Sequence, residues 1–285
     1  MKILFVAVFT DNNRSTNDSQ AVALERIGHE VVRYNYRVME KMLGSQGRDA
    51  HIINTTICEE VDLVIFSKGK GIDIRVIEEC NKVSDTCLWF MDAYMPNHWT
   101  EELIQKIQLC TFVCCDKVQA VAAAIRYNPR TYHVCEGYDN EIDKPHNLPQ
   151  DIPISFIGDP YGYRRNVCDL VGALIFEGAY GEDHAKVVSR SKINLNFCTY
   201  ACASDRIYKI LGAGGLLFTD DWEGRELEDG KDLVLFSSIP ELRDKIDYYT
   251  RHTEEAQRIR ERGYLSVQKY SRIEWARNIC NCFLS

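Results

Sequence analysis

The sequence predicts an α/β protein built from two doubly wound parallel sheets. Apolar runs alternate with helix-like segments along the chain, and one polar stretch, residues 136–151 with Pro145 and Pro149, divides this series in two. Continuously apolar strands separated by helices are typical of parallel sheets covered on both faces. A length of 285 residues also suits two domains of roughly 120–150 residues each.

The first half contains six apolar runs of strand length. They cover residues 2–8, 29–36, 62–69, 86–92, 111–115 and 131–135. Helical spacing is found between them in segments 19–28, 72–82 and 118–126. Gly28 closes the first of these helices as a C-terminal cap, because glycine readily adopts the left-handed conformation of that position.

The second half repeats the alternation and then becomes helical. Its expected strands cover residues 152–158, 192–197, 215–220 and 232–236, with helices at 183–191 and 204–214. Ser238, followed by Pro240, starts the helical C-terminal third, since serine is a preferred N-cap and proline fits the first turn.

Composition excludes several classes of protein. The net charge of −8 argues against a large electropositive nucleic-acid surface. No apolar run reaches the ~18 residues of a membrane span, and the N-terminus lacks the features of a signal peptide, so we expect a cytoplasmic protein. The twelve cysteines form no C-x-x-C pair, which favours buried free thiols over a zinc site.

Ligands of doubly wound folds bind at the carboxyl ends of the strands. Ser15, Thr16 and Asn17 follow the first strand, where they either cap the next helix or contact a ligand. Lys68 and Gly69 end the third strand, where the backbone can approach a ligand closely.

Asp92 directly ends the fourth apolar strand. It is either the cap of the turn before Pro96 or a general base, because a carboxylate there can accept a hydroxyl proton. Asp11, in the loop after the first strand, and His98 are the other candidate bases.

The second half offers a phosphate site. Gly158 ends a strand, and Arg164 and Arg165 begin the next helix, as a phosphate-binding pair or as a solvated one. Asp205, Arg206 and Lys209 lie on another helix, where Arg206 and Lys209 share a face and Asp205 can interact with the helix dipole.

Segments 205–224 and 228–249 (DRIYKILGAGGLLFTDDWEG and EDGKDLVLFSSIPELRDKIDYY) resemble the C-terminal half of nucleotide-sugar glycosyltransferases of the GT-B fold. The closest resemblance is to the spore-maturation-protein-like group among the glycosyl transferases of group 1. Residues 155–166 (SFIGDPYGYRRN) resemble the strand end and basic residues that meet the donor diphosphate, and 134–142 (VCEGYDNEI) resemble the segment that links the two halves.

This resemblance implies two facing Rossmann-like domains, an acceptor domain at 1–139 and a nucleotide-sugar domain at 140–270. Residues 271–285 would form a helix that returns to the first domain. It also implies a nucleotide-sugar co-substrate without an obligatory metal or other cofactor. The implied donor-binding residues are Gly158, Tyr163, Arg164, Arg165, Asp205, Arg206, Lys209, Gly214 and Gly215.

The chain departs from this group at one pair of positions. Many retaining relatives carry two glutamates eight residues apart, where this sequence has Ala201 and Lys209. The stereochemical outcome, inverting with Asp92 as base or retaining, therefore stays open.

The expected activity is sugar transfer from a nucleoside diphosphate sugar, with uridine as the base, to an acceptor hydroxyl. The acceptor is left open among a glycan, a small molecule, a protein and modified DNA. One alternative is a viral-type DNA glycosyltransferase that acts on hydroxymethylated bases, and another is a nucleotide-sugar binder without catalysis. The basic residues that would serve DNA binding are Arg14, Arg33, Arg37, Lys41, Arg48, Lys68 and Lys70.

Overall fold

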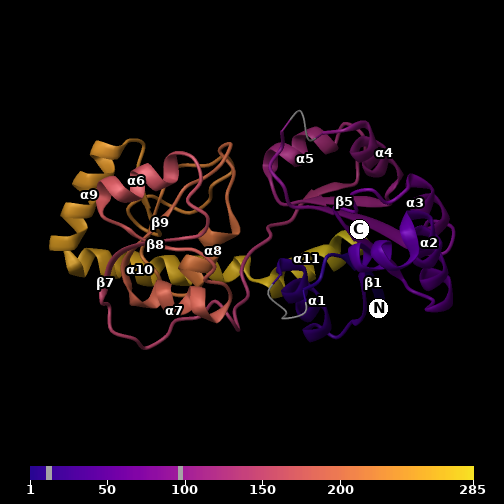
Figure 1. The fold of residues 1–285 in the computed structure, drawn as a ribbon, viewed down its shortest axis with the longest axis horizontal. Helices are drawn as coiled ribbons and strands as arrows, with labels where there is room; N and C mark the ends of the chain where they lie inside the picture. Colours follow the sequence, from indigo (N-terminus) through magenta and orange to yellow (C-terminus); the bar gives the residue numbers. More distant parts are fainter. Residues whose placement is uncertain (11–14, 96–98) are drawn as a thin grey trace. The chain divides into compact units, whose positions relative to one another are not determined.

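The computed structural model describes residues 1–10, 15–95 and 99–285. They form two compact units (Figure 1). The N-terminal unit consists of residues 1–136 and 272–285, and the C-terminal unit consists of residues 137–271.

The described part of the N-terminal unit contains a six-stranded sheet in the order β2-β1-β3-β4-β5-β6. Every neighbouring pair is parallel. The strands are β1 (Lys2–Ala7), β2 (Glu30–Asn35), β3 (Leu63–Ser67), β4 (Asp85–Phe90), β5 (Phe112–Cys115) and β6 (Thr131–His133). The helices are α1 (Thr16–Arg26), α2 (Tyr36–Cys58), α3 (Ile74–Cys80), α4 (Glu101–Leu109), α5 (Val118–Ala124) and α11 (Arg272–Leu284).

Helices cover both faces of this sheet. Successive side chains of a strand point to opposite faces. Accordingly, Leu4 and Val6 of β1 pack in a core with α2, α3, α4 and α5, whereas Ile3 and Phe5 pack in a second core with α1 and α11. Two buried faces explain why the strands are continuously apolar.

The last helix, α11, belongs to the N-terminal unit. Trp275 packs its ring 5.6 Å from that of Trp89 and 6.3 Å from that of Phe5. Arg272 is buried at the start of the helix, where it lies 3.7 Å from the Glu136 carboxylate and donates to Ser19 Oγ at 3.1 Å. Apolar burial and this ion pair together hold the end of the chain on the first sheet.

The described C-terminal unit has five parallel strands in the order β11-β10-β9-β7-β8. The strands are β7 (Ile152–Ile157), β8 (Leu174–Phe176), β9 (Ser191–Asn196), β10 (Leu217–Thr219) and β11 (Val234–Leu235). The helices are α6 (Tyr163–Val171), α7 (Glu182–Arg190), α8 (Asp205–Gly212), α9 (Ile239–Arg251), α10 (Thr253–Ser266) and a 3-10 turn, η2 (Val267–Tyr270). Two parallel α/β sheets confirm the predicted fold class.

Some elements have bounds that the sequence pattern did not predict. The pattern predicted no helix in the region of α2, which contains a non-helical Gly44 with φ 72°. It also predicted no strand at β8, which is a short edge strand of half-buried and exposed residues. The expected strand 62–69 ends at Ser67, because Lys68 and Gly69 both have φ 60°.

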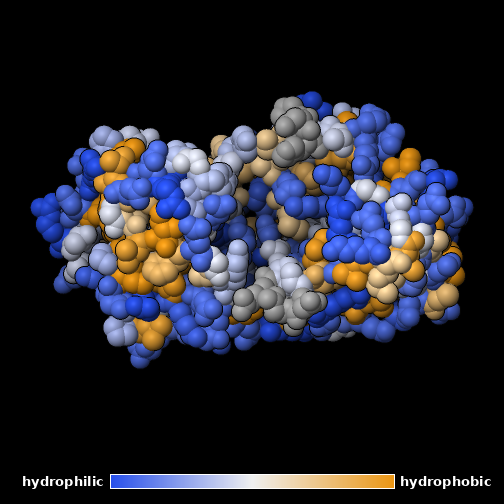
Figure 2. Space-filling view, in the orientation of Figure 1, coloured by the Kyte–Doolittle hydropathy of each residue, from blue (hydrophilic) through white to orange (hydrophobic). Residues whose placement is uncertain are grey.

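On the face shown in Figure 2, hydrophilic residues cover most of the surface and apolar patches interrupt them.

Candidate active site

In the C-terminal unit, the chain passes from β7 to β8 on one side and later to β9 on the other. The strand order therefore reverses between β7 and β9, and ligands of open parallel sheets bind at such a point, beyond the carboxyl ends of the strands. Gly158 follows β7 and Phe197 follows β9. The predicted donor residues gather around these two strand ends.

Arg206 of α8 lies directly beside the end of β7. Its guanidinium is 5.1 Å from the centroid of the Phe156 ring, and its Nη1 donates to Asn196 Oδ1 at 3.1 Å. Gly158 has φ 136°, and a Cβ added there would lie 2.5 Å from Arg206 Nη2. Only glycine therefore leaves room for this guanidinium. Burial lowers the pKa of Arg206, the charge of the Asp205 carboxylate opposes that shift, and the nearby positive charge of Arg164 adds to it.

Arg164 of α6 is buried, with 6% of its surface exposed. Its Nη2 donates to the Phe197 carbonyl at 3.1 Å and to Thr199 Oγ1 at 2.7 Å, both beyond the end of β9. Its guanidinium also lies 4.2 Å from the centroid of the Tyr161 ring. These contacts fix the orientation of Arg164 through neutral groups.

Neither guanidinium has a carboxylate partner within ion-pair distance among the residues that the structure describes. Two neighbouring cations that are largely removed from water and held by neutral acceptors repel one another and lose hydration. A bound anion relieves both costs. The arginine pair, Arg164 and Arg206, is therefore a candidate anion site at the strand-order reversal.

Other predicted donor residues have partners of their own. Arg165 lies at the surface and pairs with Glu177 at 3.0 Å, so the structure does not bring it beside Arg164. Lys209 pairs with Asp205 at 2.5 Å along α8. Tyr163 is exposed, and its hydroxyl lies 3.5 Å from Asp220 Oδ2.

Gly214 and Gly215 serve the packing of α8. Gly214 follows the C-cap of the helix with φ 72°, a conformation that glycine adopts without strain. A Cβ on Gly215 would lie 2.6 Å from Val188 Cγ1 and 2.8 Å from Ile210 Cγ2. The two glycines therefore allow α8 to turn tightly into β10.

His184 lies in the first turn of α7 and was not among the predicted site residues. It is 6% exposed, and neither ring nitrogen has a hydrogen-bond partner in the described structure. Burial, followed by the positive charge of Lys209, lowers its pKa to about 3. His184 lies four residues before the buried Val188, so both side chains share one face of α7. This helical spacing in the sequence could have indicated that His184 is buried.

In the N-terminal unit, the strand order reverses between β1 and β3. Asn17 joins their ends: its Nδ2 donates to the Val8 carbonyl at 3.0 Å, and its Oδ1 accepts from Ser67 Oγ at 2.8 Å. Ser15 caps α1 and forms a capping box with Asp18, and Thr16 is the first helical residue. The capping interpretation of Ser15 is therefore correct, while the strand-end position of Asn17 suits ligand contact.

Asp92 lies just beyond β4 and is half exposed. Its Oδ1 accepts a hydrogen bond from Lys68 Nζ at 2.6 Å, so two of the predicted residues come together. The other two candidate bases, Asp11 and His98, lie outside the described residues.

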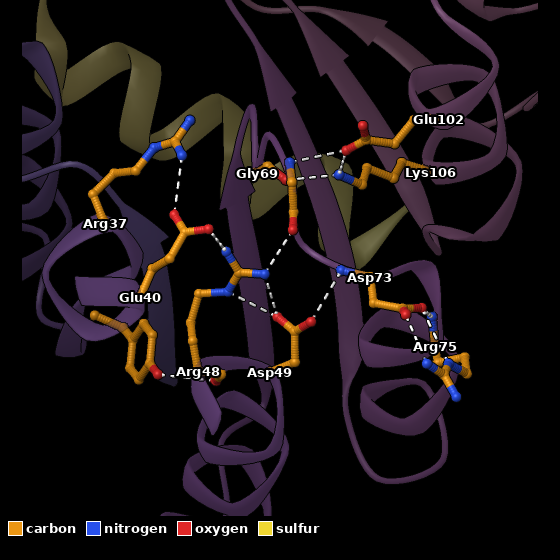
Figure 3. A network of polar contacts seen from close by, with 11 residues as sticks. Arg37, Glu40, Arg48, Asp49, Gly69, Asp73, Arg75, Glu102 and Lys106 are labelled. Atoms are coloured by element: carbon orange, nitrogen blue, oxygen red, sulfur yellow. Dashed lines mark hydrogen bonds and ion pairs between the residues drawn. The ribbon is translucent and has the colours of Figure 1, made fainter. Parts of the chain in front are cut away.

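A cavity of about 350 Å³ adjoins this pair. It is lined by Lys68, Lys70, Phe90, Asp92, Thr100, Glu102, Leu103 and Lys106. Lys106 is buried and donates to the Gly69 carbonyl at 2.6 Å and to Glu102, which also accepts from the Gly71 amide at 3.0 Å (Figure 3). Burial lowers the pKa of Lys106, and Glu102 opposes that shift. The 68–71 turn is thus tied to α4 by charged hydrogen bonds.

No group of three or more His, Cys, Asp or Glu side chains within residues 1–10, 15–95 and 99–285 could hold a metal ion. In the same part of the chain, no helix has the length and apolar character that crossing a membrane requires.

Known proteins share this fold and part of this sequence. Residues 144–281, just under half of the chain, match the family described as glycosyl transferase-like. No curated protein matches the sequence significantly.

Solved structures resemble the whole chain. HepE of Anabaena in complex with UDP-glucose has a TM-score of 0.67 at 12% identity, over 100% of this chain and 99% of that one. A glycosyltransferase from Rickettsia africae has a TM-score of 0.70 at 13% identity, over 99% and 97% of the two chains. Sucrose-phosphate synthase from Thermosynechococcus elongatus has a TM-score of 0.69 at 11% identity, over 100% and 98%.

These findings confirm the predictions of a GT-B fold and of a glycosyltransferase. The chain has the GT-B glycosyltransferase fold, and its residues 144–281 match the glycosyl transferase-like family.

Proposed function

We propose that the chain transfers a sugar from a uridine diphosphate sugar to an acceptor hydroxyl, without an obligatory metal. The arginine pair, which has no carboxylate partner among the described residues, is the observation that carries this proposal. Uridine is the base we propose because HepE of Anabaena, which shares the fold, was solved with UDP-glucose and with UDP.

The arginine pair has a direct chemical use in such a transfer. Breaking the bond between the sugar and the diphosphate leaves negative charge on the leaving group. Guanidinium groups already oriented by Asn196, Phe197 and Thr199 stabilise this charge without reorganising during the reaction. They also replace the neutralisation that a divalent metal would otherwise supply.

Asp92 is the base that we propose for the acceptor hydroxyl. Lys68 holds Asp92 Oδ1, and Oδ2 has no partner among the described residues. A carboxylate fixed through one oxygen keeps the other for proton abstraction, and general-base catalysis of this kind contributes about 10²–10⁴-fold. Lys68 then acts as a positioning residue.

We extend the proposal to location. All twelve cysteines lie within the described ranges and are free, and ten of them are buried. Free thiols persist where the surroundings are reducing. This observation supports a cytoplasmic protein.

The test is a binding titration with UDP, GDP and ADP against the wild-type chain and three arginine variants. Losing a charge-assisted hydrogen bond costs about 1.5–3 kcal/mol, so Arg206→Ala and Arg164→Ala should each weaken UDP binding about tenfold or more. Arg165→Ala is the matched control, because its side chain pairs with Glu177 at the surface, and it should bind UDP normally.

Equal affinities for all three nucleotides would refute uridine as the base. Unchanged UDP binding in both Arg164→Ala and Arg206→Ala would refute the arginine pair as the diphosphate site. Turnover of a UDP-sugar, including slow hydrolysis, distinguishes an enzyme from a protein that only binds nucleotide sugars.

A further inference from the structure

The cavity beside Asp92 carries more positive than negative charge. Three ammonium groups line it, those of Lys68, Lys70 and Lys106, against the carboxylates of Asp92 and Glu102. The whole chain has a net charge of −8, so this cavity differs in sign from the protein around it. A local field of this sign concentrates anionic ligands.

The excess charge belongs to Lys70. Lys68 is neutralised by Asp92 and Lys106 by Glu102, whereas Lys70 forms no ion pair within the described part of the chain.

Arg48, which donates to the carbonyl of Gly71, is also neutralised. It is paired with Glu40 at 3.0 Å and Asp49 at 2.8 Å (Figure 3). Asp73, the N-cap of α3 just after the turn, is paired with Arg75 at 2.8 Å. Within the described residues, the other charged groups named here are therefore paired. Lys70 lies near Glu102 without forming an ion pair with it, and Glu102 is already neutralised by Lys106, so Lys70 remains available to an anionic ligand.

Part of the cavity lining is apolar. Phe90 and Leu103 line the cavity, and Trp99 packs edge-on against Phe90 with ring centroids 5.5 Å apart. An apolar lining suits the C–H groups of a sugar ring, and the few charged side chains can bond its polar groups. A volume of about 350 Å³ is at the small end of the range for ligand pockets, roughly 300–1,000 Å³, which suits one or two sugar rings.

The backbone holds this arrangement in place. Lys68, Gly69 and Gly71 have φ of 60°, 60° and 79°, so the turn curls tightly at the end of β3. Left-handed conformations are costly for a residue such as lysine and persist where the surroundings enforce them. Here Lys106 and Glu102 of α4 hold the turn through the Gly69 carbonyl and the Gly71 amide, and Lys70 is exposed on it.

We propose that this cavity binds an acidic saccharide as the acceptor, with its phosphate or carboxylate group on Lys70 and a hydroxyl on Asp92. This inference rests on the proposed function, because it assigns the acceptor of that reaction. It names the chemical class of the acceptor, a sugar that bears a negative charge.

The experiment titrates the full chain with glucose 6-phosphate, glucuronate and glucose in the presence of saturating UDP. UDP occupies the arginine pair and prevents the acidic sugars from binding there. One charge-assisted contact corresponds to about a tenfold change in affinity. We therefore expect glucose 6-phosphate or glucuronate to bind at least about tenfold more tightly than glucose, and the tighter of the two identifies the acidic group.

Two charge reversals within the N-terminal unit make the assignment specific. Lys70→Glu should remove the preference for the acidic sugar and leave glucose binding within about twofold. Lys41→Glu is the matched control, since Lys41 is an exposed lysine of α2 and does not line the cavity, and it should keep the preference.

The inference is overturned if glucose binds as tightly as both acidic sugars, or if the Lys41 and Lys70 variants weaken binding equally. It is also overturned if UDP binds normally and none of the three saccharides binds. A chain that fails to bind UDP at all would instead refute the proposed donor, so the two failures are distinguishable.

Discussion

Lowering the pH from 7.5 to 5.0 should destabilise the C-terminal unit through His184. Burial, with a contribution from Lys209, lowers the pKa of this imidazole to about 3, while an unfolded histidine has a pKa of about 6.5. The unfolded chain therefore binds a proton that the folded chain excludes. The stability is fully present above the unfolded pKa and is lost progressively as the pH falls from 6.5 toward 3.

The size of the effect follows from these two pKa values. At pH 7.5 neither state holds much charge on this group. At pH 5.0 the unfolded histidine is almost wholly protonated and the folded one almost wholly neutral, which lowers the free energy of unfolding by about 2 kcal/mol.

Two substitutions isolate this contribution. His184→Leu removes both the titration and the two unpaired nitrogens, so it should abolish the 2 kcal/mol loss and raise stability at pH 7.5 by about 1–3 kcal/mol. His184→Gln removes the titration alone, since its amide is still a buried polar group. Urea denaturation followed by circular dichroism at both pH values measures these differences. A loss between pH 7.5 and 5.0 that is the same in the wild type and both variants would refute the reasoning.

Three further substitutions test the packing and the chemistry. Gly158→Ala should displace the Arg206 guanidinium from its position and weaken UDP binding about tenfold or more; an unchanged dissociation constant would contradict the close approach. Asp92→Asn should reduce transfer by about 100-fold or more while UDP affinity and the melting temperature stay unchanged, and near-normal turnover would leave Asp92 as a turn cap only. Gly263→Ala in α10 would place a Cβ against the Asp232 carbonyl oxygen. It should therefore lower the free energy of unfolding by about 1–3 kcal/mol, whereas the same change elsewhere in a helix usually raises it by about 1 kcal/mol. A higher melting temperature would contradict this contact.

The alternation of apolar runs and helical segments was sufficient to predict both sheets. Each strand of a doubly covered sheet must be apolar on both faces, and this requirement is visible in a continuous run of residues. The positions after the strands follow from the same pattern. Gly158 and Lys68 were therefore placed at strand ends without knowledge of the strand order. The region of α2 gave no such signal, because Gly44 interrupts the helix and much of its length is exposed.

Only the tertiary structure decided which of the neighbouring charged residues form the candidate site. Arg164 and Arg165 are adjacent in sequence but about 100° apart around a helix, so one is buried at the strand ends and the other pairs with Glu177 at the surface. Arg206 lies beside β7 because β7 and β9 are neighbours in a sheet order that residue spacing does not reveal. The unpaired state of Lys70 likewise depends on which carboxylates reach the other lysines. The sequence by itself determined the sheets and the strand ends, because burial on both faces is a local requirement, whereas charge pairing depends on contacts between distant segments.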